Sequence, residues 1–151
     1  MIAIDNIDRA LLREMQTNGS AKASELGRCV GLSQSAVWRR IKRLQDAKVI
    51  NGKRVVLDAV KLGFSVTVFL GIKLVAKGRV SLEDFERAVS AIPEVQLVQH
   101  VLGMYDYRLK VVATDLSDFE RVLRRRIMTL PGVGDVEANV LLSEEKRNFV
   151  I

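Results

Sequence analysis

An internal repeat in the second half of the chain constrains its fold more than any other feature. The tetrapeptide DFER occurs at residues 84–87 and again at 118–121, and each copy is followed by a proline phrase, IPEV at 92–95 and LPGV at 130–133. The apolar residues of each copy recur at helical spacing. Because proline cannot continue a helix, each copy predicts one helix that stops before its proline.

Four apolar stretches surround these two helices and predict strands at residues 65–75, 95–102, 105–113 and 133–143. The order strand, helix, strand, strand, helix, strand predicts a ferredoxin-like βαββαβ domain, with both helices on one face of an antiparallel sheet. The other face of the first strand is also rather apolar and carries Thr67, Phe69, Gly71, Lys73 and Val75. Since a sheet that is apolar on both faces needs a second layer, we expect a homodimer through this domain.

The first part of the chain predicts three short helices. Apolar residues at helical spacing mark the first over 4–15, and a second is predicted over 22–30. Gly31 breaks the second helix, and Ser33 is a good N-cap for a third helix over 33–47. Three helices with a tight glycine-containing turn between the last two are the outline of a helix-turn-helix. We therefore expect an α+β protein with an N-terminal helix-turn-helix domain followed by the ferredoxin-like βαββαβ domain.

The predicted third helix has two unlike sides. Placed at ~100° per residue, its apolar residues Val37, Ile41 and Leu44 fall in a narrow arc. Four polar residues centre on the opposite side: Ser35, Arg39, Lys42 and Arg43. Residues 1–60 hold 11 Lys and Arg against 6 Asp and Glu, so this part carries a net charge of +5 out of the whole-chain +6. A helix with a core side and a basic side is what a recognition helix in the DNA major groove requires.

Eight residues of this region are the predicted contacts to double-stranded DNA: Ser33, Gln34, Ser35, Trp38, Arg39, Arg40, Lys42 and Arg43. Of these, Arg40, Lys42 and Arg43 are assigned to phosphates, together with Lys53 and Arg54. Two alternatives stand beside this prediction. The basic side can be a solvated helix surface, and the boundary residue Trp38 can pack against its own domain.

The stretch between the two halves is predicted to be a connector. Asn51 and Gly52 tolerate positive φ, so they could form a type I′ hairpin, and a simple loop into one strand is the alternative. The expected organisation is a DNA-binding domain over 1–48, a connector or strand over 49–64, and a sheet domain over 65–151.

The composition argues against several classes of protein. One cysteine excludes a disulfide framework within the chain and a cysteine-based metal site. The N-terminus has acidic residues and no long apolar stretch, so no signal peptide is expected, and no apolar run approaches the ~20 residues of a membrane span. We expect a cytoplasmic protein that does not enter the membrane. The single histidine, His100, has no cysteine or histidine cluster or catalytic triad around it, so we expect no catalytic residue, metal or cofactor.

The stretch IDRALLREMQTNGSAKASELGRCVGLSQSAVWRRIKRLQDAKVI, residues 7–50, resembles the N-terminal domain of the Lrp/AsnC, or feast/famine, transcription regulators. The second half, with GMYDY at 103–107 and LPGV at 130–133, is similar to their amino-acid-sensing domain. The resemblance implies that the first domain binds DNA and that the second dimerises and assembles further, often into octamers. It also implies that small effectors, typically amino acids, bind between sensing domains.

The resemblance points to Gly103, Asp106 and Tyr107, which match the family's Gly-x-x-Asp-Tyr pattern beside the effector pocket. With Met104 and Tyr105, they are the predicted effector-binding residues. A carboxylate there could hold an α-ammonium group. The alternative is that Asp106 only balances the basic residues that follow it on the same strand face. The sequence departs from the family pattern at Gln34, where proline is common, and at Met104, where a polar residue is common.

The sequence thus predicts a DNA-binding transcriptional regulator whose oligomerisation or DNA affinity responds to a small metabolite, with an amino acid as the effector that the resemblance implies. The alternative is a low-specificity, nucleoid-associated DNA-packaging protein, because the basic first half suits either role. An enzyme is a third possibility, since some relatives with this outline are similar to decarboxylases of modified tetrapyrroles. The lone His100 gives that possibility little chemical support.

Overall fold

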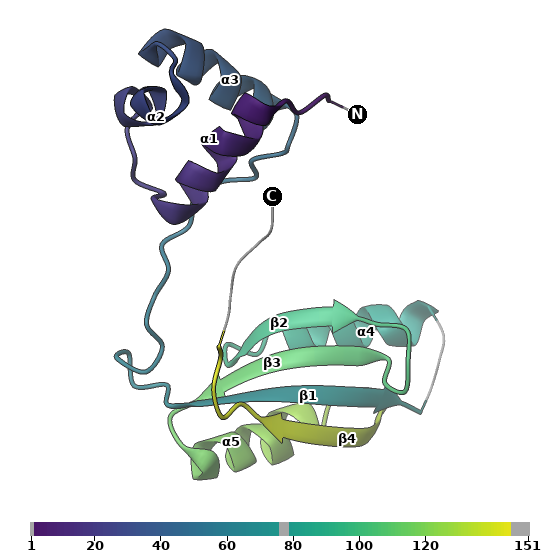
Figure 1. The fold of residues 1–151 in the computed structure, drawn as a ribbon. Coiled ribbons are helices and arrows are strands. Elements are labelled where there is room, and N and C mark those ends of the chain that lie inside the picture. The colour runs from purple at the N-terminus through teal and green to yellow at the C-terminus, as the bar shows by residue number, and fades with distance from the viewer. Residues whose placement is uncertain (1, 76–78, 146–151) are drawn as a thin grey trace. The chain divides into compact units, whose positions relative to one another are not determined.

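The computed structural model describes residues 2–75 and 79–145, and it divides into two compact units whose boundary in the chain falls between Val56 and Leu57 (Figure 1). The first unit is helical, and the second contains one sheet with its helices. In the described part of the chain, no helix is both long and apolar enough to cross a lipid bilayer.

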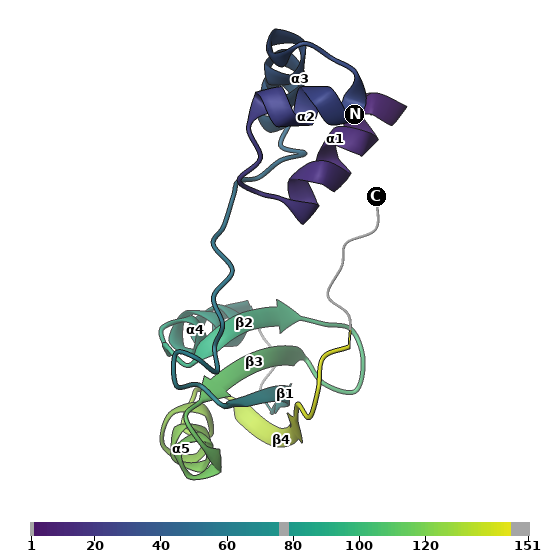
Figure 2. The same ribbon diagram turned by 60° about the vertical axis from the view of Figure 1, so that its left-hand side comes forward.

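The first unit contains the three helices that the sequence predicts: α1 (Asn6–Thr17), α2 (Ala23–Val30) and α3 (Gln34–Asp46) (Figure 2). The turn from α2 to α3 is short because Gly31 takes the left-handed conformation, with φ of 68°, at the end of α2. Ser33 then begins α3 by accepting a hydrogen bond from the Ala36 N–H at 3.3 Å. The predicted helix-turn-helix is therefore present.

The backbone of α2 lies very close to the backbone of the turn that follows it. Leu11, Leu26 and Val37, one from each helix, are buried together. Gly27, the neighbour of Leu26, faces the backbone carbonyl of Leu32, and an added Cβ would lie far inside van der Waals contact with that oxygen. The turn can only be this tight with glycine at position 27.

The connector is a loop rather than a hairpin. Residues 51–58 form neither helix nor strand, and the first strand begins only at Val66. Val55 and Val56 are 84% and 86% exposed, although both are β-branched apolar residues. The hairpin alternative is thus absent from this structure of a single chain.

The second unit is the predicted ferredoxin-like domain. Its elements in chain order are β1 (Val66–Leu74), α4 (Arg79–Ser90), β2 (Val95–His100), β3 (Tyr107–Ala113), α5 (Leu116–Val122), the π-helical turn η1 (Leu123–Ile127) and β4 (Val133–Val140). The four strands are antiparallel neighbours in the order β2-β3-β1-β4. This is the α+β arrangement that the repeat predicts.

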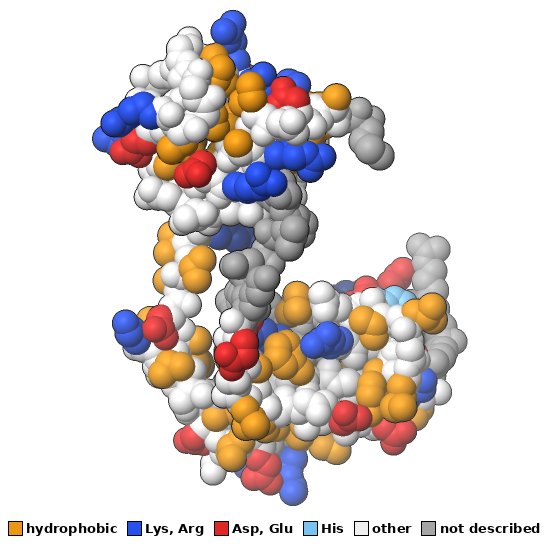
Figure 3. Space-filling model, viewed as in Figure 1, with side chains coloured by type: hydrophobic (Ala, Val, Ile, Leu, Met, Phe, Trp, Pro, Cys, Tyr) orange, Lys and Arg blue, Asp and Glu red, His pale blue; other side chains and the backbone are white. Residues whose placement is uncertain are grey.

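One face of this sheet forms the core. Val68, Leu70 and Ile72 of β1 are buried together with Phe85 of α4 and Phe119 of α5. The other face has no covering element in the described part of this unit, and its residues on β1 are only partly buried. Figure 3 shows the unit from the strand side, with hydrophobic side chains exposed between charged ones. In the single chain, β1 therefore has one buried apolar face and a second face that is only partly buried.

The π-helical turn η1 changes which residues of the last helix face the core. Its backbone bond runs from the Met128 N–H to the Leu123 carbonyl at 2.8 Å, one residue further than in an α-helix. The additional residue turns Ile127 into the core, where it is fully buried. Arg126 is consequently directed outward, and its guanidinium donates to the Glu94 carboxylate at 2.8 Å.

The close approach at Gly27 gives a stability prediction. Alanine normally favours a helix interior over glycine, but Gly27→Ala would push the Leu32 carbonyl away, and we expect a loss of about 2 kcal/mol in unfolding free energy. The measurement is chemical unfolding followed by far-UV circular dichroism. Gly19→Ala is the matched control, because its nearest neighbour to an added Cβ is 3.8 Å away. Equal stability of the two variants would contradict the prediction.

Candidate functional site

The outward side of α3 forms an open hollow at the N-terminal end of the helix. Its walls are five of the eight predicted DNA contacts: Ser33, Gln34, Ser35, Trp38 and Arg39. The hydroxyls of Ser33 and Ser35 lie 3.2 Å apart and form a hydrogen bond. All five side chains are exposed, so the start of α3 offers hydroxyl, amide and guanidinium groups to a partner outside the unit.

Trp38 projects outward beside a lysine. It is 58% exposed, and the Lys42 ammonium lies 5.3 Å from the centroid of its ring. The alternative in which Trp38 packs against its own domain is thus not what the structure shows. A cation over an aromatic ring is a favourable contact, and it holds the two side chains together on the outward side.

Arg40 and Arg43 occupy the side of α3 that faces α1. Arg40 donates to the Asp5 carboxylate at 2.7 Å and to the Asp8 carboxylate at 2.9 Å. Arg43 donates to the other oxygen of Asp8. Asp8 is fully buried, so its charge is balanced inside the unit by two guanidiniums. These two arginines have an internal function that the sequence prediction did not include.

The pKa values of the two carboxyl groups reflect this arrangement. Burial alone would raise the pKa of Asp8, but hydrogen bonds from Arg40, the Asp5 N–H and Arg43 outweigh it and lower that pKa below its ordinary value. The pKa of Asp5 is lowered by its hydrogen bond with the Asp8 N–H and then by Arg40. Both groups therefore stay ionised in the folded protein at neutral pH.

Sequence analysis missed Asp8, although the sequence contains a signal. At 100° per residue, Asp8 falls between Met15 and Leu12 on the apolar stripe of α1, where a carboxylate will be buried. A buried carboxylate needs a basic partner from another element. The pair Arg40 and Arg43, three residues apart on one side of α3, could have been proposed as that partner.

A second hollow, of about 360 Å³, lies on the uncovered face of the sheet at the β2–β3 connection. It brings together four of the five predicted effector-binding residues: Gly103, Met104, Tyr105 and Tyr107. Phe69, Arg108 and Asn139 from three strands complete its walls. The guanidinium carbon of Arg108 lies 5.0 Å from the centre of the Phe69 ring. The hollow is mainly apolar, with one charged group from β3 beside it.

Asp106, the fifth predicted residue, is not among the residues that line this hollow. Its carboxylate accepts a hydrogen bond from the Leu74 N–H at 2.9 Å, and its own N–H donates to the Ile72 carbonyl at 2.9 Å. Its carbonyl accepts from the Val101 N–H at 2.9 Å. These bonds attach the β2–β3 connection to the end of β1, which positions the residues on either side of it.

Tyr105 lies flat across Gly71. A Cβ at Gly71 would be 2.6 Å from the Tyr105 ring, so glycine is needed there for the ring to cross β1. The Tyr105 hydroxyl donates to the Glu137 carboxylate, and this bond raises the pKa of Tyr105 and lowers that of Glu137. Met104 contributes its exposed side chain, while its carbonyl accepts from the Lys73 ammonium at 2.8 Å.

Tyr107 belongs mainly to the core. Its hydroxyl donates to Glu86 at 2.6 Å, and its ring lies 4.7 Å from that of Phe85 and 4.8 Å from that of His100. Burial raises the pKa of Tyr107, and the bond to Glu86 adds to the effect. Tyr107 thus forms the floor of the hollow and connects it to α4.

Within residues 2–75 and 79–145, no cluster of His, Cys, Asp or Glu side chains that could hold a metal ion is present.

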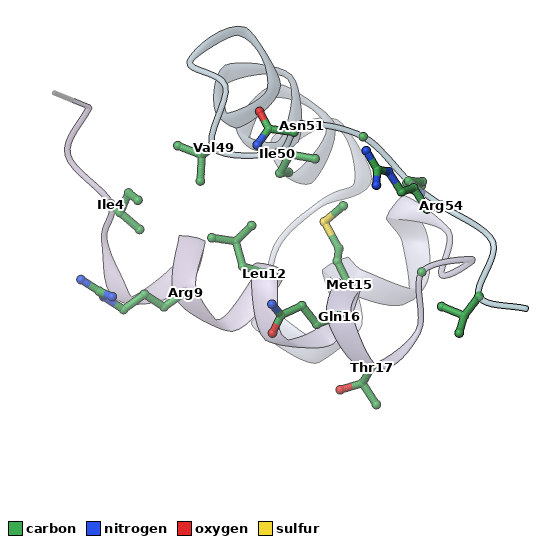
Figure 4. A pocket seen from close by; sticks show the side chains of 14 residues that line it. Ile4, Arg9, Leu12, Met15, Gln16, Thr17, Val49, Ile50, Asn51 and Arg54 are labelled. Atoms are coloured by element: carbon green, nitrogen blue, oxygen red, sulfur yellow. The ribbon is translucent and has the colours of Figure 1, made fainter. Parts of the chain in front are cut away.

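A groove of about 720 Å³ in the first unit was not anticipated from the sequence. Figure 4 shows Leu12 and Met15 of α1 on one side and Val49 and Ile50 on the other, with Arg54 nearby. None of its lining residues belongs to α3. The groove is therefore separate from the hollow on the outward side of α3.

A helix-turn-helix unit with polar and basic side chains exposed on α3, followed in the chain by a ferredoxin-like unit, has the domain order of a DNA-binding regulator. Comparison with known families agrees. Residues 4–45 match the AsnC-type helix-turn-helix domain, and residues 67–151 match the Lrp/AsnC ligand binding domain. The chain belongs to the Lrp/AsnC family of transcriptional regulators.

Individual relatives cover nearly the whole chain. The leucine-responsive regulatory protein of Haemophilus influenzae is 35% identical over 150 residues, covering 99% of this chain and 90% of that protein. The structure of transcriptional regulator NMB0573 from Neisseria meningitidis in complex with L-Met has a TM-score of 0.91 and 28% identity, covering 96% and 94%. That of the feast or famine regulatory protein of M. tuberculosis complexed with L-methionine has a TM-score of 0.86 and 29% identity, covering 97% of each chain.

The buried carboxylate gives a prediction about acid stability. Because the folded-state pKa of Asp8 lies below its ordinary value of 3.8, its stabilising contribution is complete above that pH and is lost as the pH falls further. Asp8→Asn should lower the unfolding free energy at pH 7 by about 2–4 kcal/mol, toward the low end because the two arginines can be rehydrated. It should also weaken the loss of stability below about pH 4.

Chemical unfolding at a series of pH values measures both effects. Glu14→Gln is the control, since Glu14 is an exposed carboxylate on the same helix and should leave the curve unchanged. The account fails if Asp8→Asn is as stable as Glu14→Gln at pH 7.

Proposed function

We propose that this regulator binds particular DNA sequences through the outward side of α3, and that an amino acid bound at the open sheet face changes its oligomerisation or DNA affinity. The observation that carries the proposal is the division of α3 into an inward side, tied to Asp8, and an outward side with free polar and basic groups. We place the function in the cytoplasm, because the chain belongs to a family of DNA-binding regulators.

The eight predicted DNA contacts divide into two groups in this proposal. Ser33, Gln34, Ser35, Trp38, Arg39 and Lys42 make the direct contacts. Ser and Gln can bond to bases or backbone, Arg can contact guanine at two acceptors, and Lys42 neutralises a phosphate. Arg40 and Arg43 contribute mainly by fixing α3 on α1, because their guanidiniums already bond to carboxylates. The N-terminal end of α3 adds its free N–H groups and positive dipole.

The function is tested by selecting genomic fragments with the full chain and comparing the affinity for the selected operator with that for scrambled DNA at physiological salt. A specific regulator should prefer its operator by 10³-fold or more. Equal affinity for all DNA would instead indicate a packaging protein. The same selection repeated with a panel of amino acids tests the effector.

The division of α3 predicts different salt dependences for two matched variants, each of which removes one positive charge. Lys42→Gln should reduce the slope of log affinity against log salt by about one for each bound protomer, because a phosphate contact is lost. Arg43→Gln should lower the stability of the first unit and leave the slope unchanged, because its partner is Asp8. Fluorescence anisotropy at several salt concentrations measures the slopes, and equal slopes for the two variants would contradict the assignment.

We propose the 360 Å³ hollow as part of the effector site. Its apolar walls, formed by Phe69, Met104 and Tyr105, suit an apolar amino-acid side chain, and Arg108 can pair with a carboxylate. Gly103 leaves open space, since no atom lies within 4 Å of a Cβ built there. Two relatives with structures in complex with L-methionine support an effector of this class.

Asp106 and Tyr107 enter this proposal in a different way. The bonds of Asp106 to β1 and of Tyr107 to Glu86 position the hollow rather than fill it. We therefore expect Asp106 to support the effector site by holding the β2–β3 connection, and Tyr107 by closing its floor.

We further propose that the open sheet face mediates a homodimer. Phe69 is only partly buried in the single chain, and Leu97 of β2 is 39% exposed on the same sheet. A second copy would remove this apolar surface from water. Assembly beyond the dimer, up to an octamer, follows from the resemblance to the family and is part of the proposal.

Gly71 provides a test of the effector site. Gly71→Ala should displace the Tyr105 ring across the hollow and weaken L-methionine binding by tenfold or more, because the added methyl group would lie 2.6 Å from the ring. Isothermal titration with L-methionine measures the binding, and Gly19→Ala in the other unit is the control. Unchanged L-methionine binding in Gly71→Ala would place the effector elsewhere.

A further inference from the structure

The outward side of α3 carries one large apolar side chain among small and polar ones. Ser33, Gln34, Ser35 and Arg39 line the hollow with Trp38, and the indole is 58% exposed. Tryptophan side chains are highly buried on average. An indole exposed to water on a polar surface is therefore unfavourable in free energy unless a binding partner covers it. In the described part of the first unit, the Lys42 ammonium is the cation that lies over its ring.

Lys42 restricts how the indole can be used. Its ammonium lies 5.3 Å from the ring centroid, so it occupies the space above one ring face. A base can stack on an aromatic ring only if it leaves the DNA stack, which costs free energy for each unstacked step. The major groove of an intact duplex offers base edges instead of faces. Trp38 is therefore placed for an edge contact on a paired base.

Only one base edge in the major groove is apolar. Guanine, adenine and cytosine present hydrogen-bond donors and acceptors there, whereas thymine also presents its C5-methyl group. Contact between an indole edge and this methyl group removes apolar surface of both from water, which lowers the free energy of binding. The other three bases offer no methyl group, so the same contact contributes little there. The positions of Gln34, Ser35 and Arg39 around Trp38 supply polar contacts to neighbouring base pairs.

We infer that Trp38 is a specificity-determining residue that selects thymine by contact with its C5-methyl group, with Lys42 holding the indole in place. This inference rests on the proposed function, because it requires α3 to lie in the major groove. Beyond the proposed function, the inference identifies thymine as the base that Trp38 recognises and the C5-methyl group as the part of thymine that it contacts. Lys42 is a positioning residue in this account as well as a phosphate contact.

Uracil scanning tests the inference. The operator obtained by genomic selection is synthesised with each thymine replaced in turn by deoxyuridine, which removes only the methyl group. Wild-type protein should lose about fourfold in affinity at the position under Trp38, the transfer value of one methyl group, and little elsewhere. Trp38→Ala should bind the unmodified operator about tenfold more weakly and show no penalty at that position.

Two further variants separate a base contact from a general loss of binding. Arg39→Ala should weaken binding and keep the uracil penalty, because Trp38 is intact. Trp38→Phe should retain part of the penalty, since phenylalanine is also apolar and aromatic. Circular dichroism should show unchanged folding in Trp38→Ala, because the side chain is exposed and caps no helix.

The outcomes are distinguishable. A uracil penalty that disappears in Trp38→Ala and persists in Arg39→Ala supports the inference. A flat uracil scan with strong operator preference, or a penalty of equal size in Trp38→Ala, overturns the inference and leaves the proposed function in place. Failure of the wild-type protein to select any operator overturns both.

Discussion

The position of α3 in the first unit depends on the ion pairs of the buried Asp8 carboxylate. A charge without access to water is tolerated only when neighbouring groups balance it, and here Arg40 and Arg43 of α3 do so. The two guanidiniums thereby fix α3 on α1 in one orientation. Asp5 contributes twice, by capping α1 and by bonding to Arg40. The basic charge in this unit is thus partly structural, because the guanidiniums of Arg40 and Arg43 already bond to carboxylates.

In the second unit, too, residues that were predicted to bind a ligand make hydrogen bonds within the fold. Asp106 and Tyr107, which the resemblance to the family indicates as effector residues, make bonds that hold the β2–β3 connection and the floor of the hollow. Tyr105 can lie across β1 because position 71 is glycine. The π-helical turn after α5 serves the core, since it buries Ile127 and turns Arg126 toward Glu94. The open hollow therefore lies on a sheet whose opposite face is buried in the core.

The sequence predicted the elements and their order because hydrophobic periodicity, caps and glycine turns are local signals. Gly31 and Ser33 have the roles expected of them, and the repeat at 84–87 and 118–121 marks the two sheet helices. What the sequence did not predict is long-range. The bonds of Arg40 and Arg43 to Asp8 join residues more than 30 positions apart, and Tyr107 faces the core because its strand register, not its motif, decides its direction. The contact residues of both sites remain predictions that binding experiments must test.

The most direct test of the account is a titration of the full-length, isotope-labelled protein with operator DNA, followed by nuclear magnetic resonance. The account predicts that the largest chemical-shift changes fall on the amides of Ser33, Gln34, Ser35 and Arg39 and on the indole N–H of Trp38. The guanidinium signals of Arg40 and Arg43 should stay close to their positions in the free protein, because Asp8 continues to hold them. Changes confined to the sheet domain, with α3 unaffected, would contradict the account.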